Sequence, residues 1–412
     1  MRELFVARQP ILDAQQSLVA YELLFRGSQD NKFTHDDGDA ASTQMLYNTV
    51  NVHGLNRLTR GRPAYVNMTR QLLLDETYRI LPPELTVIEL LETVAPEPDV
   101  VAACRRLKEQ GYRLALDDFV NAPGYEPLLE LADVVKLDLL SEPRSAWEKT
   151  ARKLGRWKLE LLAEKVERVE DFEAARDMGF AYFQGYFFAR PRVMAGKDVP
   201  GFKHTYLQLL EQINNPQLDW DELESVIKQD VSLSWKLLRY LNCSTMGLSH
   251  RVRSVHHALT LLGERPFRQW ASFQALAMIA DDKPPELLQL ALVRARFGEL
   301  LTQAVGEGER RFDGFMLGLL SVLDALVDRP LAELVEQIPL SADVRAALCG
   351  EASVLRPLNL LIRVCERGQF ALVQRTAEQL GVEPAVVAEA YEAAMTWADE
   401  LAEQASRSEA AA

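Results

Sequence analysis

The chain changes its hydrophobic pattern at about residue 200. Before that point, short apolar runs rich in branched and aromatic residues alternate with amphipathic stretches. Such runs are typical of buried strands, and the stretches between them of covering helices. The strand candidates are 4–12, 18–27, 64–68, 86–92, 113–119, 133–139, 158–167 and 181–189. Strands and helices alternating in this way predict a parallel sheet closed into a TIM-like (β/α)8 barrel.

The second half of the chain has a helical pattern. A Pro- and Gly-rich stretch at 191–201 ends the strand pattern and is typical of a linker. Apolar residues then recur at helical spacings over 219–242, and Asp219 is placed to cap a helix. We therefore predict an α/β domain followed by an all-α domain. The predicted boundaries are a barrel at 1–195, a linker at 196–202, an all-α domain at 203–403 and a frayed tail at 404–412.

Composition and charge exclude several classes of partner. The formal net charge is -14 without a run of lysines and arginines, which argues against a nucleic acid. The apolar runs are too short or too interrupted to span a membrane, and the charged N-terminus does not fit a signal peptide. The four cysteines are far apart and form no CxxC motif, which suggests free thiols. We expect a cytoplasmic protein with no nucleic-acid or membrane partner.

Polar side chains follow the apolar part of nearly every predicted strand. Asp117 and Asp118 come directly after the apolar residues 114–116, and adjacent carboxylates repel each other unless a cation neutralises them. In a barrel of this type such side chains converge at the carboxyl ends of the strands. Oxygen ligands in this number suit Mg²⁺ or Mn²⁺, so we predict a two-metal site. The alternative is a polar rim that only meets solvent. The side chains are Glu22, Asn67, Glu89, Asp117, Asp118, Lys136, Glu164, Glu167 and Gln184.

These residues also fall into a series of motifs. The segments, in order, are 9-QPI-11, 22-ELLFR-26, 65-YVNMT-69, 89-ELLE-92, 117-DDF-119, 136-KLD-138, 163-AEKVE-167, 184-QGY-186 and 190-RP-191. The series resembles the EAL-domain phosphodiesterases, which hydrolyse cyclic di-GMP to the linear dinucleotide. The resemblance implies metal-ligand roles for Glu22, Asn67, Glu89, Asp117, Asp118 and Glu167. It implies that Lys136 orients the attacking water and that Glu164 is a general base or a ligand. It implies substrate contacts for Arg26, Gln184 and Gln9, and a loop-supporting role for Glu92.

The chain departs from the EAL pattern at two places. The loop 120–128 replaces a glycine-rich segment that in the family supports the metal site and a dimer contact, and Lys165 replaces a glycine. These changes allow low or conditional activity, and a homodimer stays an open expectation. One hypothesis is an active phosphodiesterase. The other is a catalytically silent barrel that binds cyclic di-GMP, or only protein. The complete set of ligands favours the enzyme.

The second half resembles the HDOD domain, a modified relative of the HD phosphohydrolases. The matching segments are 229–242, 247–263 and 317–322. A metal-binding relative has a His-Asp pair where this chain has Ser321 and Val322, so we expect no metal in this half. The resemblance implies a regulatory module that binds an unknown protein partner. The predicted partner surface surrounds Arg251 and Arg253, and the alternative is an internal latch against the barrel.

Overall fold

The structure is a computed structural model that describes residues 5–26, 54–119, 124–141, 143–190, 201–215, 237 and 255–409. The chain divides into two compact units. One combines Met1–Arg190 with Leu360–Ala412 and is called the barrel unit here, and the other is Pro191–Asn359, the helical unit. The predicted helix cap at Asp219 and the surface around Arg251 and Arg253 lie outside the described residues. Within the described ranges, no helix has the length and apolar character needed to cross a membrane.

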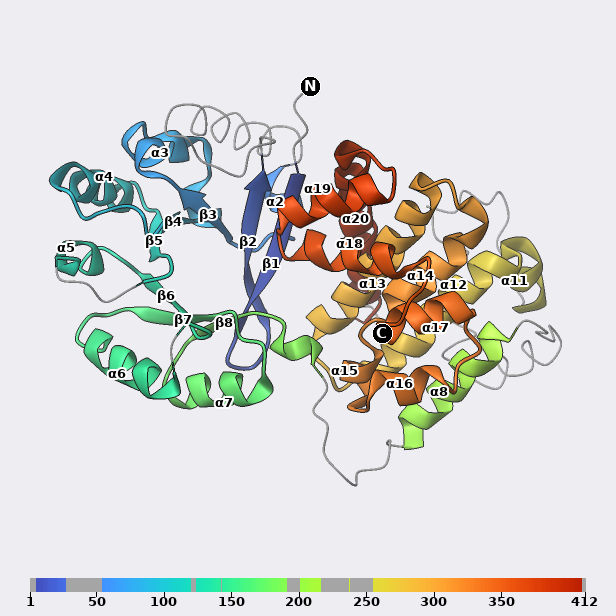
Figure 1. Cartoon of the computed structure of the whole chain (residues 1–412). Helices are drawn as coiled ribbons and strands as arrows, with labels where there is room; N and C mark the ends of the chain where they lie inside the picture. The colour runs from blue at the N-terminus through green and yellow to red at the C-terminus, as the bar shows by residue number, and fades with distance from the viewer. Residues whose placement is uncertain are drawn as a thin grey trace. The chain divides into compact units, whose positions relative to one another are not determined.

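The barrel unit contains a closed barrel in which eight strands follow one another in chain order (Figure 1). This confirms the predicted barrel. The strands are β1 (Phe5–Asp13), β2 (Leu18–Arg26), β3 (Ala64–Met68), β4 (Thr86–Leu90), β5 (Arg113–Leu116), β6 (Val134–Asp138), β7 (Glu160–Glu164) and β8 (Tyr182–Gln184).

The prediction of an all-parallel sheet is wrong at one strand. β1 runs antiparallel to both of its neighbours, β2 and β8, whereas β2 to β8 are parallel to one another. The reason is the connection at 14–17, which is far too short for the crossover that parallel strands need. The Asp13 carboxylate accepts hydrogen bonds from the backbone N–H groups of Gln15 and Ser17, so the turn closes on itself.

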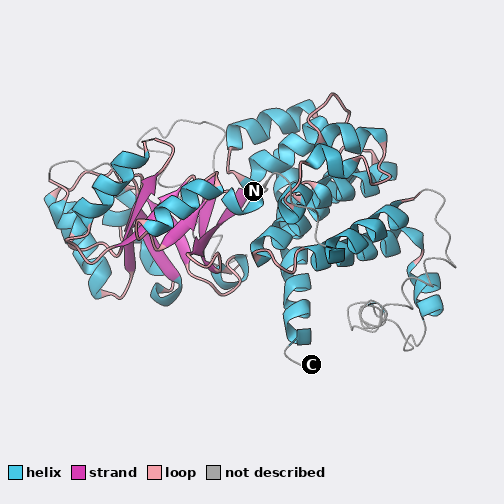
Figure 2. Ribbon diagram, turned by 90° about the horizontal axis from the view of Figure 1, so that it is seen from below, coloured by secondary structure: helices cyan, strands magenta, loops and turns pink. Residues whose placement is uncertain are grey.

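Helices cover the outside of the strands (Figure 2). They form because their apolar residues recur every three or four positions. α4, for example, buries Val100, Ala103, Cys104 and Leu107 on one side. The helices before residue 190 are α2 (Leu55–Leu58), α3 (Arg70–Leu74), η2 (Thr77–Ile80), η3 (Pro83–Leu85), α4 (Pro98–Glu109), α5 (Glu126–Leu129), α6 (Arg144–Leu154), α7 (Val169–Asp177) and η4 (Phe187–Ala189).

A layer of apolar side chains fills the barrel interior. Each strand contributes one residue to this core layer, because alternate residues of a strand point into the barrel. The members are Ile11, Ala20, Tyr65, Val87, Ala115, Val134 and Leu162, with Tyr182 packed against them. The next inward-facing residue on each strand lies two positions away, which fixes where a second layer must be.

The helical unit is all-α in its described part, as predicted. Its core includes Phe267 and Trp270. α13 and α14 pack with their backbones in close approach, since a Cβ atom on Gly318 would lie 2.1 Å from the Arg294 carbonyl oxygen. The helices are α8 (Gly201–Asn214), α11 (Val255–Leu262), α12 (Glu264–Ile279), α13 (Pro285–Ala304), η6 (Gly308–Arg310), α14 (Arg311–Leu320), α15 (Leu323–Val327), α16 (Leu331–Val335), α17 (Ala342–Leu348) and the start of α18 (Arg356–Glu366).

The last part of the chain returns to the barrel unit. α19 (Phe370–Gln379), α20 (Pro384–Glu409) and the end of α18 all group with the barrel. On sequence grounds we had assigned residues up to 403 to the helical domain, and α20 extends into the segment predicted as a frayed tail. Local periodicity identifies these residues as helical but does not tell which core they cover. The domain boundaries themselves stay a prediction.

Candidate active site

A ring of polar side chains forms the second inward-facing layer of the barrel. Each member stands two positions from a residue of the apolar core layer, so strand alternation alone places all of them on the same face. We call this set the polar ring. Its members are Gln9, Glu22, Asn67, Glu89, Asp117, Lys136, Glu164 and Gln184. The structure therefore brings together these eight of the residues predicted for the site.

Lys136 occupies the centre of the polar ring. Its side chain is 1% exposed, and its ammonium group contacts four carboxylates. The Nζ atom lies 2.8 Å from Glu164 Oε1, 3.0 Å from Asp117 Oδ1 and 3.4 Å from Glu22 Oε2, and it also pairs with Glu89 Oε1. One ammonium cannot balance four carboxylates of which three are buried, so the ring favours further positive charge or bound protons.

The pKa values of the ring reflect this imbalance. Burial raises the pKa of Glu89 well above its ordinary value, and the neighbouring Glu22 carboxylate raises it further. Burial likewise raises the pKa of Glu164, to about 8, although the Lys136 ammonium acts in the opposite direction. For Lys136, burial would lower the pKa, but the surrounding carboxylates more than offset it and the pKa is well above its ordinary value. Lys136 is therefore the permanently charged member.

Amide side chains hold Glu22 in position. Gln184 Nε2 donates to Glu22 Oε2 at 2.6 Å and to Gln9 Oε1 at 2.9 Å. Asn67 Nδ2 donates to Glu22 Oε1 at 3.3 Å. Both oxygens of this carboxylate are thus oriented by donors from β3 and β8.

The donor set fits divalent cations. Two groups of carboxylates have ligand atoms within 4.8 Å of one another: Glu22 with Glu89 and Glu164, and Asp117 with Asp118 and Glu164. Several buried oxygens of the site have no hydrogen-bond partner among the described residues, which costs free energy unless another group satisfies them. These atoms are Asn67 Oδ1, Glu89 Oε2, Asp118 Oδ1, Glu164 Oε2 and Gln184 Oε1. An oxygen-only set with unsatisfied acceptors could hold metal ions.

Two residues of the site have a left-handed backbone. Asp118 has a φ of 36° and Lys165 a φ of 53°, and such values are strained for residues with a side chain. The value at Lys165 explains why a glycine suits this position. Lys165 Nζ lies 2.7 Å from Asp138 Oδ2 and 3.5 Å from Asp118 Oδ2, so its charge is directed at the edge of the site.

Gly185 fixes the end of β8. Its φ is 142°, and a Cβ atom there would lie 2.2 Å from the Val166 carbonyl oxygen. The Val166 N–H donates to the Gln184 carbonyl, and the Phe187 N–H donates to the Val166 carbonyl. Only glycine allows this close approach, which holds Gln184 against the segment that follows Glu164.

Four predicted site residues are not part of the polar ring, and of these Asp118 belongs to the second carboxylate group. Glu167 lies outside both carboxylate groups and has Arg190 at 3.7 Å. Glu92 is exposed, and the Arg26 side chain is outside the described residues. Their roles as metal ligand, loop support and substrate contact stay predictions. Sequence reasoning also missed Asp138 as the partner of Lys165. Asp138 lies two positions beyond Lys136 on β6, so strand alternation would have placed its side chain in the next inward-facing layer.

Family models match both halves of the chain. The EAL domain matches residues 40–191, and the HDOD domain matches residues 199–335.

Two relatives are similar along nearly the whole chain. The uncharacterized protein YuxH of Bacillus subtilis is 33% identical over 96% of this chain and 98% of its own length. The cyclic di-GMP phosphodiesterase CdgJ of Vibrio cholerae is 34% identical over 96% of this chain and 93% of its own. Among solved structures, the Bacillus subtilis YkuI protein with an EAL domain, in complex with c-di-GMP and calcium, is 17% identical. The match covers 64% of this chain and 73% of that chain, with a TM-score of 0.39.

Proposed function

This chain belongs to the family of proteins that join an EAL domain to an HDOD domain, and from that premise we propose that its barrel hydrolyses cyclic di-GMP to the linear dinucleotide. The observation that carries the proposal is the polar ring. Its carboxylates converge on one layer of the barrel, and within the described part of the chain a buried oxygen of Glu89 and one of Glu164 have no hydrogen-bond partner. The 34% identity to CdgJ along nearly the whole chain supports the same substrate.

We propose Mg²⁺ or Mn²⁺ as the cofactor. Glu22 and Glu89 would hold one ion, and Asp117 and Asp118 a second, with Asn67 Oδ1 as a further donor, while Glu164 stands close to both groups. When bound, two such ions would polarise the phosphodiester and lower the pKa of a water molecule. The role of the protein residues is then to place water and substrate and to move one proton.

Glu164 is suited to accept that proton. Its Oε1 is held by Lys136, while its Oε2 has no partner within the described residues. In the metal-free protein burial raises the pKa of Glu164 to about 8, so this carboxyl has a high affinity for a proton. We therefore propose that the attacking water gives its proton to Glu164 Oε2, and that the positive charge of Lys136 polarises that water.

The helical unit is proposed as the regulatory part. The HDOD domain covers most of it, and we infer that it binds a protein partner. The catalytically silent barrel is not favoured, because the polar ring is complete.

The test is turnover of cyclic di-GMP by the purified full chain with Mg²⁺ or Mn²⁺, followed by chromatography of the linear product. Glu89→Gln removes a charge from a fully buried ligand and should lower the rate by more than about 100-fold, since even partners of ligands cost 10–100-fold. Glu109→Gln on the exposed face of α4 is the matched control and should keep the wild-type rate. Equal rates for the two variants, or no product from the wild type with either ion, would refute the proposal.

A further inference from the structure

The turn that joins α18 to α19 meets the barrel beside the polar ring. It touches three strand regions through three consecutive residues. The Glu366 carbonyl accepts a hydrogen bond from Gln9 Nε2 at 3.5 Å. The Arg367 guanidinium lies over the Tyr186 ring, 5.3 Å from its centroid. A Cβ atom on Gly368, where φ is 62°, would lie 2.7 Å from Leu24 Cδ1.

The positions of these contacts show which side of the polar ring the turn occupies. Gln9 is itself a member of the ring. Leu24 stands two positions beyond Glu22 on β2, so it points inward one layer further out. Tyr186 stands two positions beyond Gln184, after the end of β8. The turn therefore lies at the outer edge of the ring, on the side away from the apolar core layer.

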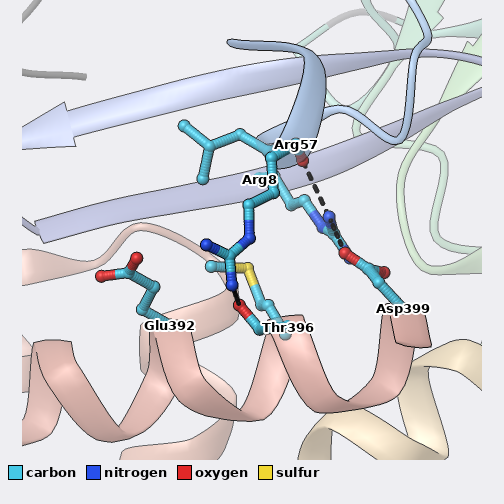
Figure 3. A pocket seen from close by; sticks show the side chains of 7 residues that line it. Arg8, Arg57, Glu392, Thr396 and Asp399 are labelled. Atoms are coloured by element: carbon cyan, nitrogen blue, oxygen red, sulfur yellow. Dashed lines mark hydrogen bonds and ion pairs between the residues drawn. The ribbon is translucent and has the colours of Figure 1, made fainter. Parts of the chain in front are cut away.

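The turn is held in this place by buried residues. Glu366 and Cys365 are buried, and the Tyr391 side chain of α20 is 3% exposed. α20 is itself fixed to the barrel, because Arg8 of β1 forms a two-pronged ion pair with Asp399 (Figure 3). Arg57 reaches the same helix and donates to Thr396 Oγ1. The turn is thus a built part of the barrel unit.

Arg367 differs from the buried Glu366 and the half-buried Gly368 on either side of it, because its side chain is exposed. The Tyr186 ring lies beside the guanidinium, and the exposed side chain has N–H donors along the edge of its planar group. Such an edge matches the geometry of phosphate oxygens. A stacked arginine also loses less conformational freedom when it binds, since the ring has already restricted it.

We propose that Arg367 binds a phosphate of the cyclic dinucleotide, so that the segment after the helical unit completes the substrate site of the barrel. This inference rests on the proposed function. Cyclic di-GMP carries two phosphodiester groups, and the polar ring can take only the one that reacts. The second phosphate needs a cation elsewhere, since the ring is rich in carboxylates. Arg367 supplies that charge from the edge of the ring.

The experiment measures binding without turnover. Calorimetry with the full chain, cyclic di-GMP and Ca²⁺ gives the dissociation constant of the dinucleotide. Arg367→Ala should weaken binding by about tenfold or more, the usual effect of losing a hydrogen bond to a charged group. Arg367→Lys should recover part of the affinity, because it keeps the charge but loses the planar edge. Arg375→Ala is the matched control, since Arg375 is exposed on α19.

A purely structural role gives a different result. If Arg367 only stiffened the turn, Arg367→Ala would lower the melting temperature, or the affinity for Mn²⁺ measured without the dinucleotide. If Arg367 contacts a phosphate, both quantities stay unchanged. In turnover assays the expected change is a higher KM with kcat nearly kept. Wild-type affinity in Arg367→Ala would overturn this inference and leave the proposed function intact. Absence of dinucleotide binding by the wild type would overturn both.

Discussion

The ion pair between Arg8 and Asp399 gives the sharpest test of the barrel unit, because it joins residues from opposite ends of the sequence. The Arg8 side chain is 6% exposed and that of Asp399 is 14% exposed. Their two hydrogen bonds measure 2.8 and 2.6 Å. Asp399→Ala would leave the buried guanidinium with the Leu58 carbonyl at 2.7 Å and the Tyr21 ring at 4.8 Å.

The expected cost follows from that geometry. Removing one partner of a buried ion pair costs about 3–5 kcal/mol, and the contacts that Arg8 keeps reduce this to about 2–4 kcal/mol. In a unit of this size the melting temperature should fall by at least about 5 °C. Replacing both partners, as in Arg8→Met with Asp399→Leu, should cost less than the single change, because no unpaired charge stays buried.

The assay is urea unfolding of the full chain followed by circular dichroism. Glu389→Ala, an exposed change on the same helix, is the control and should leave the unfolding curve in place. If the free energies of unfolding of Asp399→Ala and that control differed by less than about 0.5 kcal/mol, the contact of α20 with β1 described here would be refuted.

Two further predictions concern the charges of the site. Lys165→Gly should raise the free energy of unfolding by about 1 kcal/mol, because glycine adopts the left-handed backbone without strain. It should also raise the affinity for Mn²⁺ a few-fold, because a cation next to Asp118 is removed. Thermal melts and calorimetry would check the two effects, and Lys165→Ala is the control, since it removes the charge and keeps the strain. The pKa of Glu164 is raised from its ordinary value of 4.5 to about 8. In the metal-free protein, protonated Glu164 therefore contributes to the free energy of unfolding in full below pH 4.5, and this contribution is lost as the pH rises through about 8. Mn²⁺ affinity should rise over the same interval because the ionised Glu164 carboxylate adds negative charge beside the ions. A flat or falling affinity between about pH 6 and pH 9 would contradict the assignment.

The polar ring was predictable because two local rules agree on it. Strand alternation places Glu89 two positions after Val87 and Lys136 two positions after Val134, and barrel strands bring such residues to one layer. The antiparallel direction of β1 was also predictable, since the connection at 14–17 is too short for a crossover.

The docking of the C-terminal helices could not be predicted in the same way. Arg8 and Asp399 are separated by 391 positions, and neither lies in a motif that points to the other. The periodicity of α20 shows only that the helix has a face to bury. Which surface receives that face depends on the shapes of both partners in three dimensions, and so the contact of Glu366 with Gln9 was equally hidden.

The return of α19 and α20 to the barrel has a consequence for the synthesis of the protein. β8 ends at Gln184, but Phe370, where α19 begins, is translated only after the helical unit. At 5–20 residues per second, the ribosome needs about 10 to 40 seconds to cover that distance. During this time the nascent barrel has all eight strands, while Arg8 still lacks Asp399. The barrel strands are therefore synthesised first, but the barrel unit is complete only when α19 and α20 have been added. An mRNA truncated within the part that encodes the helical unit yields a barrel without these helices.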